Sequence, residues 1–323
     1  MTSAKFETYG LEVTNLNQQQ YDMFCDRLKV GGLRDEYRRL TFDESGRRQF
    51  LTQALSQTAK DKINQQETLV GAQLAERFRD SLRDIVIEEG YESLIDLERL
   101  NEVLGLGWTF SEIPYHSACG GWAGKTRLMW VRKGLGRSLV ALTNDLLSCD
   151  YSLHFEDAFR PTGVQEGLFR RRYVMAHEAQ PFWSNEDCLL EAQSKTAFTP
   201  RFAAHKAGAA VDVRIRDLKN GQLLEIGHDY PDGGETVRLD SPYVTQEQWQ
   251  NRKLLYVVAQ RAGLVMYPFE DWHVSMNDVT AAVVQGRGAR KVTYGPIKEF
   301  DRKSGSITHA YDLNELDEVF DVL

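Results

Sequence analysis

Apolar residues in the first hundred positions recur at steps of three and four, the period of an amphipathic helix. The clearest run, residues 66–89, predicts one helix with Gly90 as its C-cap. Residues 17–37 and 94–104 share this rhythm and also predict helices. Because these segments carry no recognisable set of reactive side chains, we interpret residues 1–105 as a helical extension. It would pack on the main domain or mediate self-association.

After Gly105 the pattern changes to short strands and helices punctuated by glycine. Residues 136–147 predict a helix, and residues 151–159 a strand. Apolar and polar residues alternate from 211 to 216, which places Asp212 opposite the aliphatic face at the start of a hairpin. The turn of this hairpin is predicted at Asn220-Gly221, because both residues accept positive φ.

Later segments continue the same mixture of helix and strand. Residues 245–248, Thr-Gln-Glu-Gln, have the form of a capping box and open a predicted helix that Gly263 stops. A strand over 264–269 follows, and the tail predicts a hairpin around Gly305 and an acidic helix over 314–322. We therefore expect an α+β fold in three parts: the extension, a catalytic domain over 106–278 and a C-terminal hairpin and helix over 279–323.

Composition and charge exclude several classes of function. The chain has 323 residues, 42% of them hydrophobic, which is typical of a soluble globular protein. Its net charge of −8 disfavours a nucleic-acid partner, which needs a basic face. No apolar run approaches the ~20 residues that span a bilayer, and the start lacks the apolar core of a secretion signal. We expect a cytoplasmic protein without a membrane partner.

The cysteines are scattered and lack a CxxC spacing, so they predict neither a disulfide framework nor a thiolate metal site. They are Cys25, Cys119, Cys149 and Cys188.

Candidate chemistry is concentrated at five positions: Arg160, His205, Asp212, Glu270 and His273. Two histidines and an aspartate, His205, Asp212 and His273, form a set typical of a catalytic zinc site, with a fourth position left to water. Glu270 would be the base beside it. Small residues fill the interval between His205 and Asp212, and we expect Gly208 to permit close backbone approach where larger side chains would crowd the metal. Taken singly, each of these residues also has an ordinary structural explanation.

Taken together, these positions resemble the motifs of the zinc D-alanyl-D-alanine dipeptidases, in the same order. The likeness covers roughly residues 115–276, and these enzymes share their fold with D,D-carboxypeptidases and the Hedgehog signalling domain. The matching motifs are Phe159-Arg160-Pro161, His205-x-x-Gly208-x-Ala210-x-Asp212 and Glu270-x-Trp272-His273.

The resemblance implies a Hedgehog/D,D-peptidase-like domain with a small antiparallel sheet and flanking helices. It implies one Zn²⁺ per chain, bound by His205, Asp212 and His273. Glu270 would accept a proton from the metal-bound water and pass it to the leaving amine. Arg160 would stabilise the oxyanion, and the reaction would be hydrolysis of a peptide or amide.

Departures from the family's pattern concern the substrate pocket. Ala203 replaces a serine, and Gly121-Trp122 replaces an Asn-Phe pair in a glycine-rich segment that makes Tyr115 and Trp122 candidate substrate-binding residues. The family's acidic residue for the substrate ammonium aligns with Pro231. Either Asp229 or Asp232 would serve after a small shift, or neither would. His228, close by, is either a substrate ligand or a solvent-facing loop residue.

We therefore expect a zinc-dependent peptidase that hydrolyses a small dipeptide such as D-Ala-D-Ala or a related amide. Two alternatives stay open: a D,D-carboxypeptidase or amidase acting on larger cell-wall (peptidoglycan) peptides, and a non-catalytic zinc-binding module of the same fold. A non-haem iron oxygenase is disfavoured, because seven positions separate His205 from Asp212 where that class uses two. The expected partner is the small substrate, with a homo-oligomer formed through the N-terminal helices as a further possibility.

Overall fold

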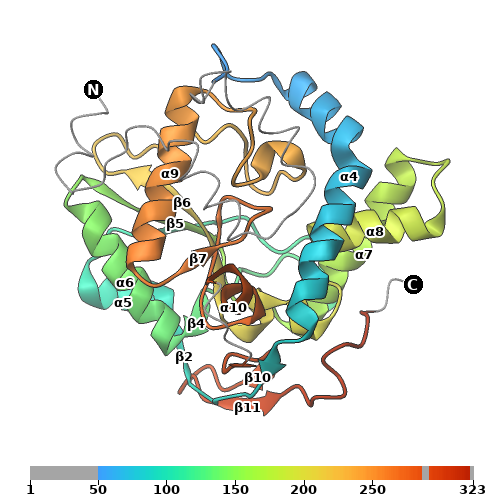
Figure 1. The fold of residues 1–323 in the computed structure, drawn as a ribbon. Helices are drawn as coiled ribbons and strands as arrows, with labels where there is room; N and C mark the ends of the chain where they lie inside the picture. Colours follow the sequence, from blue (N-terminus) through green and yellow to red (C-terminus); the bar gives the residue numbers. More distant parts are fainter. Residues whose placement is uncertain (1–49, 286–290, 321–323) are drawn as a thin grey trace.

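A five-stranded sheet lies at the centre of the computed structural model, which describes residues 50–285 and 291–320 (Figure 1). The spatial order of the strands is β3 (Thr109–Phe110), β5 (Tyr151–Asp157), β6 (Ala210–Asp217), β8 (His273–Ser275) and β7 (Val265–Met266). β3 runs parallel to β5, and the other neighbours pair antiparallel. The predicted α+β architecture is confirmed.

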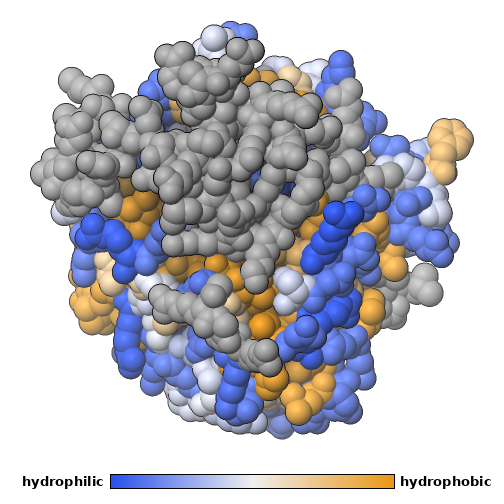
Figure 2. Space-filling model, viewed as in Figure 1, coloured by the Kyte–Doolittle hydropathy of each residue, from blue (hydrophilic) through white to orange (hydrophobic). Residues whose placement is uncertain are grey.

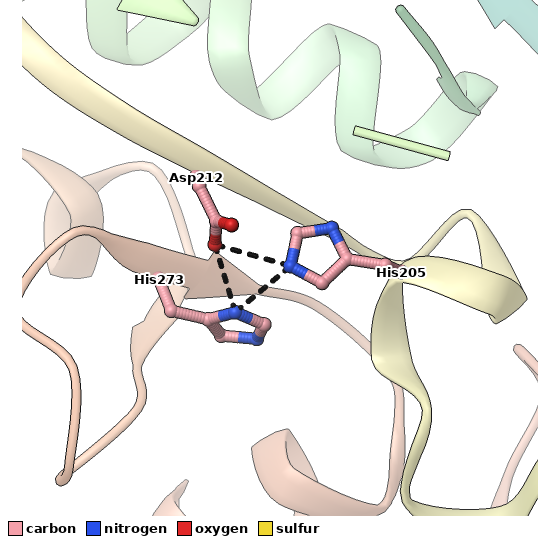
Figure 3. Close-up of side chains that lie close together, drawn as sticks. All are labelled: His205, Asp212 and His273. Atoms are coloured by element: carbon pink, nitrogen blue, oxygen red, sulfur yellow. Dashed lines mark hydrogen bonds and ion pairs between the residues drawn. The ribbon is translucent and has the colours of Figure 1, made fainter. Parts of the chain in front are cut away.

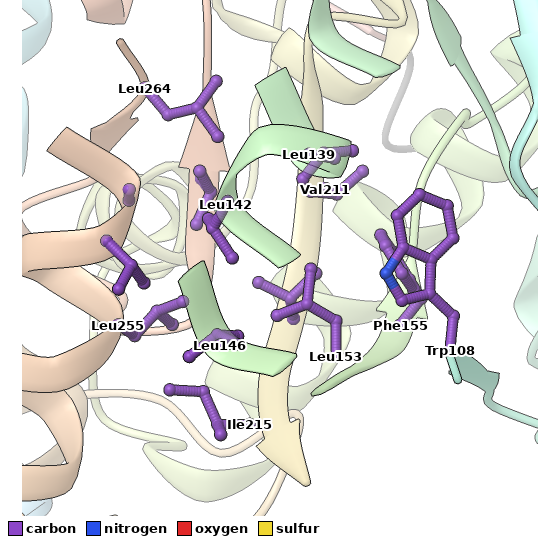
Figure 4. Close-up of a cluster of buried hydrophobic side chains, with 14 of the residues drawn as sticks. Trp108, Leu139, Leu142, Leu146, Leu153, Phe155, Val211, Ile215, Leu255 and Leu264 are labelled. Atoms are coloured by element: carbon purple, nitrogen blue, oxygen red, sulfur yellow. The ribbon is translucent and has the colours of Figure 1, made fainter. Parts of the chain in front are cut away.

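One face of this sheet packs against α6 (Lys133–Leu147) and α9 (Gln246–Arg261) (Figure 4). Fully burying one large aliphatic side chain contributes about 1.5–3 kcal/mol, so this layer is the main apolar contribution to the stability of the fold. Its members include Val211, Val213 and Ile215 of β6, Leu139, Leu142 and Leu146 of α6, and Leu255 of α9.

The opposite side of the molecule carries α4 (Gln57–Arg83), α7 (Thr162–Ala179) and α8 (Asn185–Lys195), to the right of the sheet in Figure 1. The inner face of α4 packs with α10 (Val279–Gln285) in an apolar cluster that includes Leu74, Phe78, Leu82, Phe269 and Val279. Its outer face is polar, as the hydrophilic surface over this helix in Figure 2 shows. The helix is therefore an integral wall of the molecule.

The capping box and its helix are confirmed. Gln248 N–H donates to Thr245 Oγ1 (3.2 Å), and Gln248 Oε1 accepts from Thr245 N–H (3.0 Å). α9 follows and ends before Gly263, which adopts φ 77°. The predicted helix 136–147 is also confirmed, as α6 begins three residues earlier.

The predicted helix 66–89 is wrong at both ends. α4 begins earlier, capped by Ser56, whose Oγ accepts from Ala59 N–H (3.3 Å). It stops before β1 (Val86–Ile87), which pairs in parallel with β9 (Lys291–Val292). Gly90 is not a C-cap, and its N–H donates to Thr293 O (2.9 Å). The distant partner strand stabilises the extended chain, and local periodicity carries no information about that partner.

The predicted helix 94–104 is shorter than expected for the same reason. Its first three residues form β2 (Leu94–Asp96), antiparallel to β4 (Trp130–Arg132). Asp96 then caps α5 (Leu97–Leu104) by accepting from Glu98 N–H (3.0 Å), and Gly105 ends it at φ 63°. The predicted helix 17–37 lies outside the described residues.

The C-terminal part contains the predicted hairpin, but the residues described up to 320 do not form the predicted helix. β10 (Ile297–Phe300) and β11 (Ile307–Ala310) pair antiparallel, and Gly305 between them has φ 73°. Residues 313–317 form turns and residues 318–320 have no regular structure. Glu315 accepts from Lys298 Nζ and from the N–H of Asp312.

The other predicted strands are present but shorter: β5 ends at Asp157, and β7 covers only two residues. The predicted turn at Asn220-Gly221 is followed by a single bridge between Arg216 and Leu223. Short 3-10 helices complete the fold: η1 (Ser117–Trp122), η2 (Pro200–Phe202), η3 (Ala204–Ala207) and η4 (Glu235–Val237). Among the described residues, no helix has the length and apolarity needed to cross a membrane.

Candidate metal centre and active site

Three side chains from separate elements converge beside the sheet (Figure 3). Asp212 on β6 lies directly opposite His273 on β8 in the antiparallel register, so strand pairing alone sets these two side by side. His205 comes from η3, which precedes β6. The separations of His205 Nε2 from Asp212 Oδ1, of His205 Nε2 from His273 Nδ1 and of His273 Nδ1 from Asp212 Oδ1 are each 3.1 Å.

Gly208 links η3, which carries His205, to β6, but glycine is needed there for a different reason from the one predicted. It adopts φ 63°, a left-handed conformation that favours glycine. A Cβ there would lie 3.3 Å from Leu94 Cδ2, and the Gly208 carbonyl accepts from Arg132 N–H (2.8 Å). Close approach is therefore needed toward β2 and β4 rather than toward the metal site.

The donor set fits a zinc ion. Ligand bonds of about 2.0–2.1 Å in a tetrahedral site place the ligand atoms about 3.3 Å apart, close to the three separations here. His205 Nδ1–H donates to Ala158 O (2.7 Å), which leaves the Nε2 lone pair facing Asp212 and His273. All three side chains are buried, so a cation is the natural partner of their converging lone pairs.

The second oxygen of Asp212 is bound from the other side. Asp212 Oδ2 accepts from Arg160 Nη2 (2.9 Å) and from the Tyr230 hydroxyl (3.0 Å). Arg160 Nε also donates to Asp157 Oδ2 (2.8 Å), which fixes the guanidinium between two carboxylates. Asp157 and Tyr230 were missed in the sequence, although each adjoins a position that had been considered: Asp157 precedes the Phe159-Arg160-Pro161 motif, and Tyr230 precedes Pro231.

Charge around Asp212 keeps it ionised. Burial alone would raise the pKa of Asp212, but His205, His273 and Arg160 outweigh burial and hold this pKa well below its ordinary value. Burial likewise opposes the charge of Arg160, but Asp157 and Asp212 raise the pKa of Arg160 above its ordinary value. The carboxylate is therefore available as an anionic ligand, and the guanidinium beside it stays charged.

Glu270 lies next to the triad without belonging to it. Its Oε2 is 3.8 Å from His273 Nδ1, and 27% of its side-chain surface is exposed. Burial raises the pKa of Glu270 to about 7, Asp212 adds to the rise, and His273 and Arg160 oppose it. A divalent cation on the triad would oppose this rise further. Glu270 is thus placed to exchange a proton near neutral pH.

Two pockets meet at Glu270. The first opens over the triad and is lined by His205, His273, Glu270 and Arg160, together with Arg79 and other residues. The second is lined by Asp232 and Glu235 among others, and none of the three triad side chains lines it. Both are lined by Ser194, Lys195 and Glu270, so the site extends from the carboxylate in two directions.

The predicted substrate residues are dispersed. Asp232 lines the second pocket, whereas Asp229 is exposed and its N–H donates to Asp232 Oδ2 (3.1 Å). Tyr115 is buried, and its hydroxyl donates to Phe159 O (3.1 Å) and accepts from Leu128 N–H (3.1 Å). Trp122 packs beside Lys125 and Arg302. Neither aromatic side chain lines the two pockets at Glu270.

His228 is neither a solvent-facing residue nor a pocket residue, which corrects both predicted roles. It is buried, and its Nε2 lies 2.7 Å from Asp271 Oδ1. Arg252 holds the other oxygen of Asp271 (2.7 Å). This network, packed on Trp272, anchors the turn that carries Glu270 and His273.

Comparison with known families matches residues 126–287, half of the chain, to a family model described as D-ala-D-ala dipeptidase. The matched span contains the three converging side chains, Glu270 and Arg160. It does not contain α4. No curated protein matches the chain.

Proposed function

Because the chain belongs to the D-Ala-D-Ala dipeptidase family of zinc peptidases, we propose that it hydrolyses a small dipeptide such as D-Ala-D-Ala or a related amide. The observation that carries this proposal is the convergence of three buried donor atoms, each 3.1 Å from the next, with the carboxylate of Glu270 beside them. Three protein ligands for the metal and an adjacent general acid–base group are the features that a zinc peptidase requires.

His205, Asp212 and His273 would hold the zinc ion. When bound, Zn²⁺ supplies Lewis acidity: it lowers the pKa of water and polarises the scissile carbonyl. The hydrogen bond from His205 Nδ1 to Ala158 O orients one ligand, and the bonds from Arg160 and Tyr230 to Asp212 Oδ2 orient another.

Glu270 acts as the general base and then as the general acid. It accepts a proton from the attacking water as the new C–O bond forms. It then donates this proton to the leaving nitrogen as the C–N bond breaks, which yields a carboxylic acid and an amine; the acid's proton then passes to the amine, leaving a carboxylate and an ammonium. A pKa raised toward neutrality suits both transfers.

Arg160 stabilises the negative charge that develops on the carbonyl oxygen. Its hydrogen bonds to Asp157 and Asp212 hold the guanidinium rigid at the wall of the first pocket, so it needs no reorganisation during the reaction.

Asp232 would bind the free ammonium of the substrate. Its side chain lines the pocket that meets the first at Glu270, on the side away from the triad. A peptide bond held beside Glu270 then places its amino-terminal residue in this second pocket.

A carboxypeptidase acting on longer peptides is the second candidate, and one observation favours it. The second pocket continues into a wider hollow, because both are lined by the same set of residues: Asn64, Arg172, Glu191, Lys195, Asp232 and Gly233. The amino-terminal side of the site therefore has room for more than one residue.

The test is release of free amino acid by zinc-loaded protein from D,D-, L,D-, D,L- and L,L-dipeptides and from a pentapeptide ending in D-Ala-D-Ala. We expect turnover of D-Ala-D-Ala that Glu270→Ala loses while zinc stays bound stoichiometrically. Glu247→Ala, at an exposed position on α9, is the matched control.

If free amino acid is released from the pentapeptide but from no dipeptide, the carboxypeptidase function replaces the proposed dipeptidase function. No release from any substrate with zinc bound would contradict both and support a non-catalytic module. Full activity of Glu270→Ala would contradict the general-base assignment.

A further inference from the structure

Arg79 is a buried cation in the wall of the first pocket that the chemistry above does not use. It is 4% exposed and lines this pocket together with His205, Glu270 and His273. It belongs to α4, outside the residues that match the family model. The pocket over the triad is therefore completed by a segment that the family match does not cover.

Two of the three guanidinium nitrogens of Arg79 have no hydrogen-bond partner among the described residues. Nη1 donates to Gln193 O (2.7 Å), whereas the two without a partner, Nε and Nη2, are buried. Leaving a buried donor without a partner is costly, and more so for a charged group. Burial lowers the pKa of Arg79 from its ordinary value, although Tyr267, Glu76 and Asp80 oppose this change.

The free donors form one geometric unit. Nε and Nη2 lie on the same edge of the planar guanidinium, and this edge matches the two oxygens of a carboxylate. Because the two nitrogens are enclosed, a carboxylate reaches them only when the side chains of the pocket wall move slightly apart.

Packing fixes this guanidinium relative to the triad. The Tyr267 ring contacts both Phe78 of α4 (centroids 5.8 Å apart) and the His273 ring (5.5 Å). The Arg79 guanidinium lies over the Phe198 ring at 5.3 Å. α4 is thus packed, through one aromatic side chain, against a residue of the metal centre.

We propose that Arg79 binds the C-terminal carboxylate of the substrate, so that the enzyme selects peptides whose scissile bond lies close to a free carboxylate end. This proposal rests on the proposed function and deepens it. Arg79 lines the first pocket and Asp232 the second, and Glu270 lines both, so a substrate with its carboxylate on Arg79 and its ammonium on Asp232 would extend across Glu270. A substrate that ends in an amide presents one acceptor oxygen and one NH2 donor to this edge, so at least one of the two nitrogens would stay unpaired and the substrate would be disfavoured.

The experiment compares kcat/KM for D-Ala-D-Ala with that for D-Ala-D-alaninamide. We expect the wild-type protein to prefer the free acid about 100-fold, the size of effect expected when a buried charged group loses a hydrogen bond. Arg79→Gln should lose this preference, because its kcat/KM for the free acid should fall while its kcat/KM for the amide stays unchanged. Arg79→Lys keeps the charge but lacks the planar edge, so its preference for the acid should lie between those of the wild type and Arg79→Gln.

Arg77→Gln, at an exposed position on the same helix, is the matched control and should behave as wild type. An equal loss on acid and amide in Arg79→Gln, or an unchanged preference, would overturn the proposal. A further substrate is a dipeptide amide with an acidic side chain. If it is hydrolysed as well as the free acid, Arg79 binds a side-chain carboxylate, and the assignment to the C-terminal carboxylate is overturned.

A binding measurement separates this proposal from the proposed function. Isothermal calorimetry on metal-free protein would compare N-acetyl-D-alanine with N-acetyl-D-alaninamide. Binding of the acid by wild type and not by Arg79→Gln supports the carboxylate site even where no dipeptide is hydrolysed. Absence of binding by wild type, or equal binding by Arg79→Gln, contradicts it even where hydrolysis is observed.

Discussion

At the scale of single residues, the two carboxylate oxygens of Asp212 have different partners and different roles. Oδ1 faces the two histidines, while Oδ2 accepts from Arg160 and Tyr230. Each bond to Oδ2 holds the carboxylate in the orientation that a metal ligand requires.

Tyr230→Phe should weaken zinc binding about 10-fold, because partners of metal ligands typically contribute that much or more. Burial, together with Asp212 and Asp157, raises the pKa of Tyr230, so its hydroxyl stays protonated and donates. Competition with a chromophoric chelator would measure the affinity, with the exposed Tyr91→Phe as control. Unchanged affinity would show that Arg160 alone orients Asp212.

Arg160→Lys should lower kcat about 100-fold while zinc content is retained. A lysine keeps the positive charge, but one ammonium lacks the planar fork that spans Asp157 and Asp212. Steady-state kinetics with parallel metal analysis would measure both quantities. A wild-type kcat would place the stabilisation of the oxyanion elsewhere.

At the scale of elements, the position of α7 depends on a close approach of helix to backbone. A Cβ on Gly167 of α7 would lie 2.3 Å from Ala118 O and 2.6 Å from Cys119 Cα, both main-chain atoms of η1. The neighbouring Gly163, on the same helix, would place its Cβ 3.5 Å from Trp122 Cδ1, which is an ordinary contact.

Gly167→Ala should therefore lower the free energy of unfolding by about 1–3 kcal/mol, as expected for overpacking against groups that cannot give way. Gly163→Ala is the matched control and should be neutral or slightly stabilising, because alanine favours the helix. Urea unfolding of both variants would measure the difference. Equal stabilities would mean that α7 shifts away from η1 at little cost.

At the scale of the whole molecule, α4 closes the fold over a buried carboxyl. Glu235 of η4 is 3% exposed, lies against Gly71 of α4 and is 3.6 Å from Arg238 Nε. Burial raises the pKa of Glu235 to about 7; Arg238 opposes the rise and Asp240 adds to it.

Glu235→Gln should change the pH dependence of stability. Between pH 4.5, the ordinary value, and about 7, the folded wild type binds more protons than the unfolded chain, so its free energy of unfolding falls as pH rises. The variant cannot ionise and should be more stable at pH 8 by about 3 kcal/mol at most, with no difference at pH 4. Glu76→Gln, exposed on α4, is the control for urea unfolding across this range. A constant difference at all pH values would contradict the prediction.

The sequence by itself determined the features that depend on neighbouring residues. Alternation predicted β6, and glycine and the capping box bounded α9. The order of the motifs pointed to the residues of the triad. Each of these signals lies within a short stretch of the sequence. The tertiary structure decided what depends on distant partners. Strand pairing ended one predicted helix early and replaced the first residues of another. The register of β6 against β8 joined Asp212 to His273, and packing brought Tyr230 to Asp212 and Arg79 to the pocket. Local periodicity reports which face of a segment is buried but not against which segment it is buried, and those contacts arise only when the whole chain folds.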